Sequence, residues 1–331
     1  MIASRTTASS LPEYDAPDAC MDEYELGQEC DAFLTAKKTT TITGSESKTA
    51  TAPCKKKFSF SDEETEGVSP FSLSSGESPL RSPKYDQEDV HGFNSDFAFK
   101  LLLQKQTKNR FFNPQAHHVA YRTKVISWMA NLVKKFEYNE STFHFAVGYF
   151  DAVLSLYTVT LKQIKLISYI CLYIAAKMEE RDGKIPSIDE AFKLFDNEFS
   201  SNEIINCEKL VFKILDYQLN IKTPYTFTTF FLSKGILLQS ELPLVMQSGE
   251  QQQFVEKMET LINELICKSL NNYAFYRYSS IAIAASAVAL ARQQMGISCV
   301  WSEGLQNLTM LSWESINECF ALLESESRVA A

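Results

Sequence analysis

Two charged residues lie in segments that are otherwise apolar enough to be packed. Lys177 ends a run, Leu166 to Met178, with apolar residues on every side of the helix it would form. Glu208 lies in the middle of a second helical pattern, directly after Cys207. A buried charge is tolerated mainly when it is paired. The question is therefore whether the partner of each charge lies in this chain or in another protein.

Chemistry alone leaves two interpretations of these charges open. Lys177 is near the C-terminal end of its helix, where the helix dipole favours a cation, so an ordinary surface lysine is one interpretation. If Lys177 and Glu208 meet, they form a charged spot bordered by Met178, Phe212 and Leu219. Its spare donors and acceptors could satisfy the backbone groups of another protein, which is the second interpretation.

A second pair of charges is predicted to be internal. Arg122 begins one helix, and Asp151 lies in the next, flanked by Phe150 and Val153. The short joint at residues 138–141 makes these helices antiparallel neighbours. We expect Arg122 and Asp151 to form an ion pair that fixes how the helices cross, the alternative being two solvated surface charges.

Bulk properties exclude several classes of protein. The 331 residues carry a net charge of -9, and no basic stripe offsets the acidity, which argues against a nucleic-acid binder. The eight cysteines are scattered without a C-x-x-C pair, as expected of a reducing intracellular protein without a zinc site. No signal peptide or run long enough to span a membrane is visible, so we expect a soluble protein.

No pattern of catalytic residues stands out. The four histidines, His91, His117, His118 and His144, have no metal-binding spacing, and adjacent His117 and His118 are interpreted as a polar helix start. A glycine-rich phosphate loop and a nucleophile elbow are both missing. The sequence predicts no metal, no cofactor, no catalytic residue and no enzyme.

Residues 1–92 are rich in Ser, Thr, Pro, Asp and Glu, and their apolar residues show no sustained period. Such a segment cannot bury enough surface to offset its ordering entropy, so we predict a disordered regulatory tail. Three serines precede prolines and are candidate sites of proline-directed phosphorylation: Ser69, Ser78 and Ser82. Any tail this rich in Ser and Pro also produces such pairs by chance. Lys55 to Lys57 are a short basic run of the kind that directs nuclear import.

From residue 93 onward the sequence is typical of an all-α protein. We predict helices at 95–107, 119–136, 141–156, 160–179, 187–196, 200–217, 224–237, 251–272, 278–294, 300–309 and 312–326. Helices 160–179 and 278–294 are apolar on all faces, as expected at the centre of a bundle. Each is the third of five helices in its half. The sequence therefore predicts two tandem five-helix bundles, with an extra helix before the first.

The motifs of the first bundle resemble the cyclin box. They are Arg122-x-x-Val125-x-x-Trp128-Met129, Tyr149-Phe150-Asp151-x-x-Leu154, Ala175-Ala176-Lys177-Met178-Glu179-Glu180 and Glu208-x-x-Val211-Phe212. Arg122, Asp151, Leu166, Lys177 and Glu208 fill the five positions of the family signature in order. Residues 223–331, including Thr223-Pro224-Tyr225 and Tyr278-Ser279-Ser280, resemble the C-terminal cyclin fold. The resemblance assigns 93–222 to an N-terminal cyclin box with its preceding helix and leans toward the D-type branch.

The resemblance implies a function that the chemistry left open. In cyclins, the residues matching Lys177 and Glu208 hydrogen-bond to the backbone of a cyclin-dependent kinase, with Met178, Phe212 and Leu219 as the apolar surround. Phe97, Leu101 and Leu102 would add a second contact. The chain is then expected to be a regulatory subunit that activates the kinase in cell-cycle control, in the nucleus or cytoplasm. The alternative is a cyclin-fold interaction protein, like a transcription factor, that activates no kinase.

Kinase substrates and inhibitors are further expected partners, through a patch that many cyclins carry on the first box helix. The matching apolar positions here are Tyr121, Val125, Trp128 and Ile164. Lys124 replaces an apolar residue, and Asn131 stands where an acidic residue often pairs with a substrate arginine. We therefore interpret this patch as degenerate.

Overall fold

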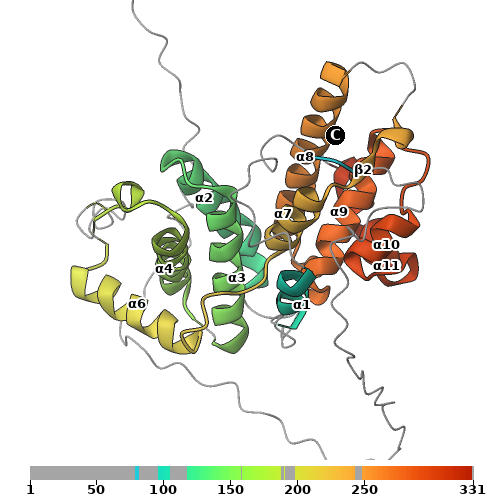
Figure 1. Cartoon of the computed structure of the whole chain (residues 1–331). Helices are drawn as coiled ribbons and strands as arrows, with labels where there is room; N and C mark the ends of the chain where they lie inside the picture. The colour runs from blue at the N-terminus through green and yellow to red at the C-terminus, as the bar shows by residue number, and fades with distance from the viewer. Residues whose placement is uncertain are drawn as a thin grey trace, which may run out of the picture. The chain divides into compact units, whose positions relative to one another are not determined.

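A computed structural model describes residues 79–81, 96–104, 118–157, 159–187, 190, 198–242 and 248–329. The first group of helices packs around one apolar core (Figure 1) and comprises α2 (Val119–Lys135), α3 (Glu140–Leu156), α4 (Leu161–Glu179) and α6 (Ser201–Ile214), with a 3-10 turn η4 (Asp182–Lys184). The second group packs around another core and comprises α7 (Pro224–Lys234), α8 (Ser248–Asn271), α9 (Ser280–Gln294), α10 (Glu303–Thr309) and α11 (Trp313–Val329), with 3-10 turns η5 (Gln239–Glu241) and η6 (Tyr273–Arg277).

The two helices predicted to be central are central. Helix α4 packs against α2, α3 and α6, and its residues from Leu166 to Ala176 are all buried. Helix α9 packs against α7, α8 and α11, and is buried from Ser280 to Arg292. Helix α9 is rich in buried alanines, whereas α4 buries mainly large side chains and has alanines only at residues 175 and 176. The prediction of an all-α fold with two tandem bundles is confirmed.

Side-chain caps lie at several predicted helix starts, whereas α8, α9 and α10 begin at Ser248, Ser280 and Glu303 and not at the predicted residues 251, 278 and 300. Ser200 and Glu203 form a reciprocal capping box at the start of α6, and the Thr223 side chain caps α7 with Pro224 in its first turn. The Ser187 amide donates to Glu190 Oε2 at 2.7 Å, and the Glu190 amide donates to Ser187 Oγ at 3.3 Å. The rest of the helix predicted at 187–196 lies outside the described residues, apart from Glu190.

Two helices end earlier than their periodicity predicts. Helix α6 ends at Ile214 rather than at residue 217, because Asp216 and Tyr217 adopt left-handed backbone conformations with φ of 52° and 57°. Helix α7 ends at Lys234 rather than at residue 237, because Gly235 has a φ of 85°. Apolar side chains continue past both ends, so periodicity alone does not mark them.

A short strand, β2 (Leu237–Leu238), follows Gly235 and pairs antiparallel with β1 (Pro79–Leu80). Pro79 lies opposite Leu238, and Leu80 lies opposite Leu237. The sequence predicts disorder throughout residues 1–92, and β1 is a local exception to that prediction. The other residues of the predicted tail, Arg81 apart, lie outside the described part of the chain.

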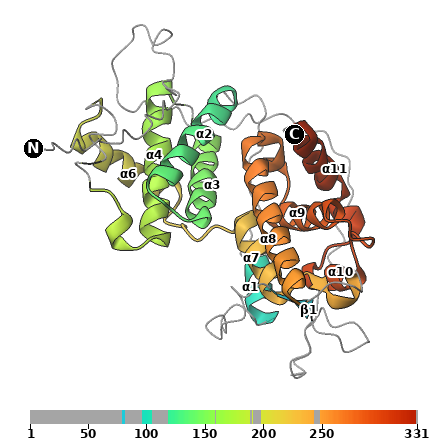
Figure 2. The ribbon, with the colours of Figure 1, turned by 90° about the horizontal axis from the view of Figure 1, so that it is seen from above.

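Helix α1 (Asp96–Gln104) packs on the second bundle, beside α7 (Figures 1 and 2). The Phe99 ring stacks on Phe230 at a centroid distance of 4.6 Å, and Leu102 is buried in the same core. The sequence groups this helix with the first bundle because it precedes it. Its apolar side chains are instead buried by the second bundle.

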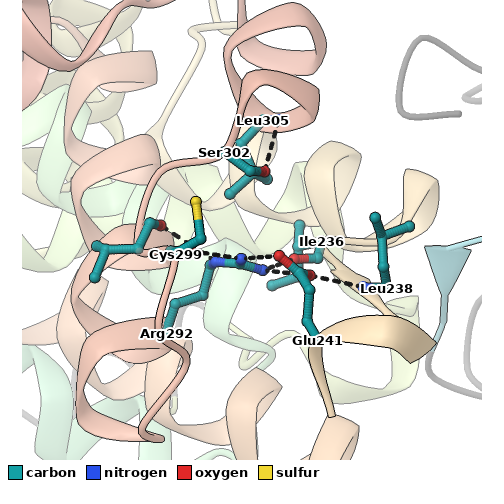
Figure 3. A network of polar contacts seen from close by, with 8 residues as sticks. Ile236, Leu238, Glu241, Arg292, Cys299, Ser302 and Leu305 are labelled. Carbon is teal, nitrogen blue, oxygen red and sulfur yellow. Dashed lines mark hydrogen bonds and ion pairs between the residues drawn. The ribbon is translucent and has the colours of Figure 1, made fainter. Parts of the chain in front are cut away.

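Arg292 has no exposed surface and organises the segment that follows α7 (Figure 3). Its guanidinium forms an ion pair with Glu241 and donates to the carbonyl oxygens of Ile236 at 2.6 Å and Cys299 at 2.8 Å. Glu241 Oε2 in turn accepts the Leu238 amide at 2.8 Å. A buried arginine is tolerated here because these groups satisfy its donors. Sequence analysis missed Arg292, although its place at the end of an all-apolar helix parallels that of Lys177.

Within the described residues, no helix is long and apolar enough to cross a membrane. The same part of the chain holds no cluster of three or more His, Cys, Asp or Glu side chains that could bind a metal ion.

Candidate functional site

Lys177 and Glu208 meet at the surface of the first bundle. Lys177 Nζ donates to Glu208 Oε1 at 2.7 Å and lies 4.2 Å from the centroid of the Tyr173 ring. The side chains are 39% and 19% exposed, so both remain accessible to another molecule. The charged spot that the sequence leaves conditional is therefore formed, and each charge has a partner within this chain.

The packing of α4 against α6 positions the pair. Lys177 lies in the last turn of α4, where the partial negative charge of the helix end favours its ammonium group. Glu208 lies on α6 next to Cys207, whose buried side chain faces the core. Burial raises the pKa of the Cys207 thiol to about 12, so this side chain stays neutral and packs as a small apolar group. The turn of the helix then directs Glu208 outward.

The side chains predicted to form an apolar border are exposed or half-buried. Met178 is 54% exposed, and Phe212 and Leu219 are half-buried against the first core. The Tyr149 hydroxyl donates to the Leu219 carbonyl at 2.6 Å and holds that segment against α3. We call Lys177, Met178, Glu208, Phe212 and Leu219 the Lys–Glu face.

Tyr217 adds a side chain to this border that sequence analysis missed. It is 68% exposed, and its ring stacks on Phe212 at a centroid distance of 6.2 Å. The helical periodicity extends the predicted helix to residue 217 and so hides the turn. The left-handed conformations at Asp216 and Tyr217 turn the chain away from the axis of α6 and leave the tyrosine on the surface.

Arg122 and Asp151 form the predicted internal ion pair. Arg122 Nε and Nη2 each donate to an Asp151 oxygen at 2.8 Å, and both residues are buried. Arg122 Nη1 also donates to the Leu270 carbonyl at 2.6 Å, and its guanidinium lies 5.3 Å from the Tyr273 ring centroid. The pair therefore fixes α2 on α3, as predicted, and also ties both helices to the end of α8 in the second bundle.

His144 is a second contact between the bundles. It lies on α3 with 1% of its surface exposed, stacks on Tyr225 of α7 at 5.5 Å, and brings Nε2 to 3.8 Å from Cys267 Sγ of α8. Its Nδ1 has no hydrogen-bond partner among the described residues. Burial lowers the pKa of the imidazole to about 3, so the ring is neutral in the folded protein.

The candidate docking patch has little apolar surface. Val125 and Ile164 are 4% and 2% exposed and belong to the first core, while Tyr121 and Trp128 are half-buried against it. Lys124 and Asn131 are exposed on the same helix. The four apolar positions thus contribute mainly to packing, in agreement with a degenerate patch.

The remaining predicted residues are distributed as follows. Leu166 is buried in the first core. Leu102 is buried against the second bundle, so the prediction that it contacts a partner protein is wrong, whereas Leu101 is 38% exposed. The side chain of Phe97 and the candidate phosphorylation sites Ser69, Ser78 and Ser82 lie outside the described residues.

Two models of known protein families match the chain, one over each of its helical bundles. Residues 97–220 match the family model described as the cyclin N-terminal domain, and residues 222–330 match that of the cyclin C-terminal domain. The chain belongs to the cyclin family.

Its relatives include cyclins of plants and a nematode. The chain is 26% identical over 226 residues to the G2/mitotic-specific cyclin S13-7 of Glycine max, covering 68% of this chain and 80% of that protein. It is 26% identical to the G2/mitotic-specific cyclin-A1 of Caenorhabditis elegans and to Cyclin-B2-3 of Arabidopsis thaliana, covering 69% and 70% of this chain. The matches span 45% and 48% of those two proteins, about half of their lengths.

A solved viral cyclin from herpesvirus saimiri is 21% identical and covers 68% of this chain and 88% of its own, with a TM-score of 0.47. The family assignment rests on the two family models. The relatives named above carry mitotic or B-type names, and the lean toward the D-type branch stays a prediction.

Replacing Arg122 with alanine is expected to lower the free energy of unfolding by about 3–5 kcal/mol, because it leaves the Asp151 carboxylate buried without its partner. Urea denaturation of the full chain measures this loss. The matched control is Lys165→Ala, which breaks the exposed Lys165–Glu198 pair of the same bundle and is expected to cost less than about 1 kcal/mol. Equal losses in the two variants would contradict an internal role for Arg122.

His144 is expected to make the protein less stable as the pH falls below about 6.5. The unfolded chain binds a proton at this residue below that pH, while the folded chain does not until about pH 3, so stability is lost over this window. At pH 5.5 the loss is about 1.4 kcal/mol. Urea denaturation between pH 5.5 and 7.5 should show this slope in the wild type and a flatter one in His144→Gln. Parallel slopes would show that His144 is not buried in its neutral form.

Proposed function

We propose that this cyclin binds a cyclin-dependent protein kinase through the Lys–Glu face and activates it as a regulatory subunit. The observation that carries the proposal is the exposed Lys177–Glu208 pair within an apolar border. An isolated surface ion pair contributes little to stability, about 0–1 kcal/mol, so folding alone gives little reason for this arrangement. Binding a partner gives a better one.

Beyond the bond between them, Lys177 has further hydrogen-bond donors and Glu208 has further acceptors. A lysine ammonium has three donors, and Lys177 uses one of them on Glu208. The Glu208 carboxylate accepts that bond at Oε1 and keeps further acceptor sites. The ammonium can therefore donate to a main-chain carbonyl while the carboxylate accepts from a main-chain amide. This combination suits the exposed backbone at the end of a helix or in a loop of the partner.

The apolar border would supply most of the buried area in the complex. Met178 and Tyr217 are the large exposed side chains next to the pair, and a flexible methionine and an aromatic ring both suit a protein interface. Covering them would also exclude water from the Lys–Glu pair. Its hydrogen bonds to the partner then become stronger than they would be in solvent.

Activation follows from positioning. In protein kinases, an ion pair between a lysine and a glutamate on a mobile helix must be in place before phosphoryl transfer. A rigid protein surface that binds this helix only in its active position shifts the kinase toward the active state. On this proposal the cyclin contributes differential binding energy, and the kinase supplies the catalytic groups. The names of the mitotic relatives support a role in cell division.

Lys177→Ala and Glu208→Ala are each expected to weaken kinase binding by at least about thirtyfold, the loss that corresponds to about 2 kcal/mol at an interface hot spot. Helical circular dichroism should be unchanged, because the pair is exposed. The measurement is affinity purification of the tagged full chain from dividing cells, identification of the bound kinase by mass spectrometry, and a phosphotransfer assay. Lys165→Ala again serves as the control, since it removes an exposed lysine paired with Glu198 on the same bundle.

Each outcome has a distinct meaning. Wild-type kinase binding by the Lys177→Ala, Glu208→Ala double variant would show that the Lys–Glu face is not the binding surface. Unfolding of either single variant would assign the pair a structural role instead. A kinase that binds the wild-type chain without gaining activity would favour the alternative of a cyclin-fold interaction protein.

A further inference from the structure

Strand β2 pairs along one edge with β1, a segment that lies far before it in the sequence. Pro79 and Leu80 pair with Leu238 and Leu237 as an antiparallel ladder. The half-buried Leu80 side chain packs against the second core, and it borders a small hollow together with Leu232, Ile236, Leu237, Val255 and Met258. Backbone pairing combined with one anchored side chain is how many proteins bind an extended peptide.

Gly235 makes room for this segment. A Cβ atom at this position would lie 2.8 Å from Pro79 Cβ and 2.9 Å from the Leu80 carbonyl oxygen, closer than such atoms approach one another. Its φ of 85° also disfavours any other residue. The glycine therefore both ends α7 and allows the backbone of β1 to approach.

The second bundle holds β2 in place with its own side chains (Figure 3). Arg292 donates to the Ile236 carbonyl at 2.6 Å, and Glu241 accepts the Leu238 amide at 2.8 Å. The Arg292–Glu241 ion pair links these two contacts. The edge that receives β1 is thus held by residues of the second bundle.

The residue types of β1 suit an edge strand of a β-sheet. Proline has no N–H and is tolerated on edge strands. Opposite Pro79, the amide of Leu238 already donates to Glu241, so neither residue of this pair is left with an unsatisfied backbone donor. Leu80 then supplies the apolar side chain that packs against the second core.

We propose that Gly235 to Leu238, with the adjoining apolar side chains of the second core, form an intramolecular docking site whose occupant is the chain's own Pro79–Leu80 segment. The site recognises an extended Pro-Leu sequence by backbone pairing and by packing of the half-buried leucine. It anchors the N-terminal region to the second cyclin box, independently of the Lys–Glu face. This inference does not rest on the proposed kinase binding.

Trypsin cleavage after Arg81 tests the proposal, because this arginine directly follows β1 and a protease needs the residues before the cut in an extended, unpaired form. In the wild-type full chain, β1 must detach before cleavage. Gly235→Ala is expected to raise the cleavage rate after Arg81 by about tenfold, the effect of losing the contacts of one half-buried leucine. Mass spectrometry of the fragments over a time course measures the rate.

The matched control is Gly296→Ala. Gly296 has a similar φ of 81°, but a Cβ atom there meets nothing within 4 Å. Both variants introduce backbone strain into the second bundle, and only Gly235→Ala displaces β1. Leu80→Ser provides a second test that leaves the residues of the bundle unaltered and places no charge beside the cleaved arginine, and it should also accelerate cleavage. A wild-type rate in both Gly235→Ala and Leu80→Ser, or equal acceleration in Gly296→Ala, would overturn the proposal.

Discussion

The arrangement of the two cyclin boxes depends on the burial of Arg122. A guanidinium removed from water is tolerated only when its donors are satisfied, and here they bond Asp151 of α3 and the Leu270 carbonyl at the end of α8. One side chain of α2 therefore fixes a helix crossing in the first box and a contact with the second. His144 of α3, neutral and buried, adds ring stacking on Tyr225 of α7 and an Nε2–Sγ contact with Cys267 of α8 to the same junction.

Burial separates the roles of three ion pairs that look similar in sequence. Arg122–Asp151 and Arg292–Glu241 involve arginines with almost no exposed surface, and each organises backbone carbonyls around itself. Lys177–Glu208 has the same internal pairing, but both side chains remain accessible. A buried pair specifies the fold, whereas an accessible pair with spare donors and acceptors can bind a partner. The proposed kinase interface follows from that difference.

Periodicity predicted the two bundles, their central helices and most helix starts to within a residue, because these depend on local sequence. The meeting of Lys177 with Glu208 depends on α4 packing against α6, and the sequence could state it only as a condition. Tyr217 and β1 were missed for a different reason. Left-handed residues after α6 and the glycine after α7 change the path of the chain, and apolar patterns do not record such changes. Helix α1 packs on the second box through Phe99. This too is a tertiary contact, and the position of α1 before the first box in the sequence does not reveal it.

The most direct test of the central claim exchanges the two charges of the Lys–Glu face. In the Lys177→Glu, Glu208→Lys double variant, an internal ion pair can still form, but the donor and acceptor presented to a partner are interchanged. Stability should be measured by urea denaturation and kinase affinity by titration with the co-purified kinase. Our account predicts a loss of at most about 2 kcal/mol in the free energy of unfolding, from the helix-end and Tyr173 contacts of the Lys177 ammonium, with the protein still folded and kinase binding lost. Wild-type kinase affinity in the exchanged variant would contradict it.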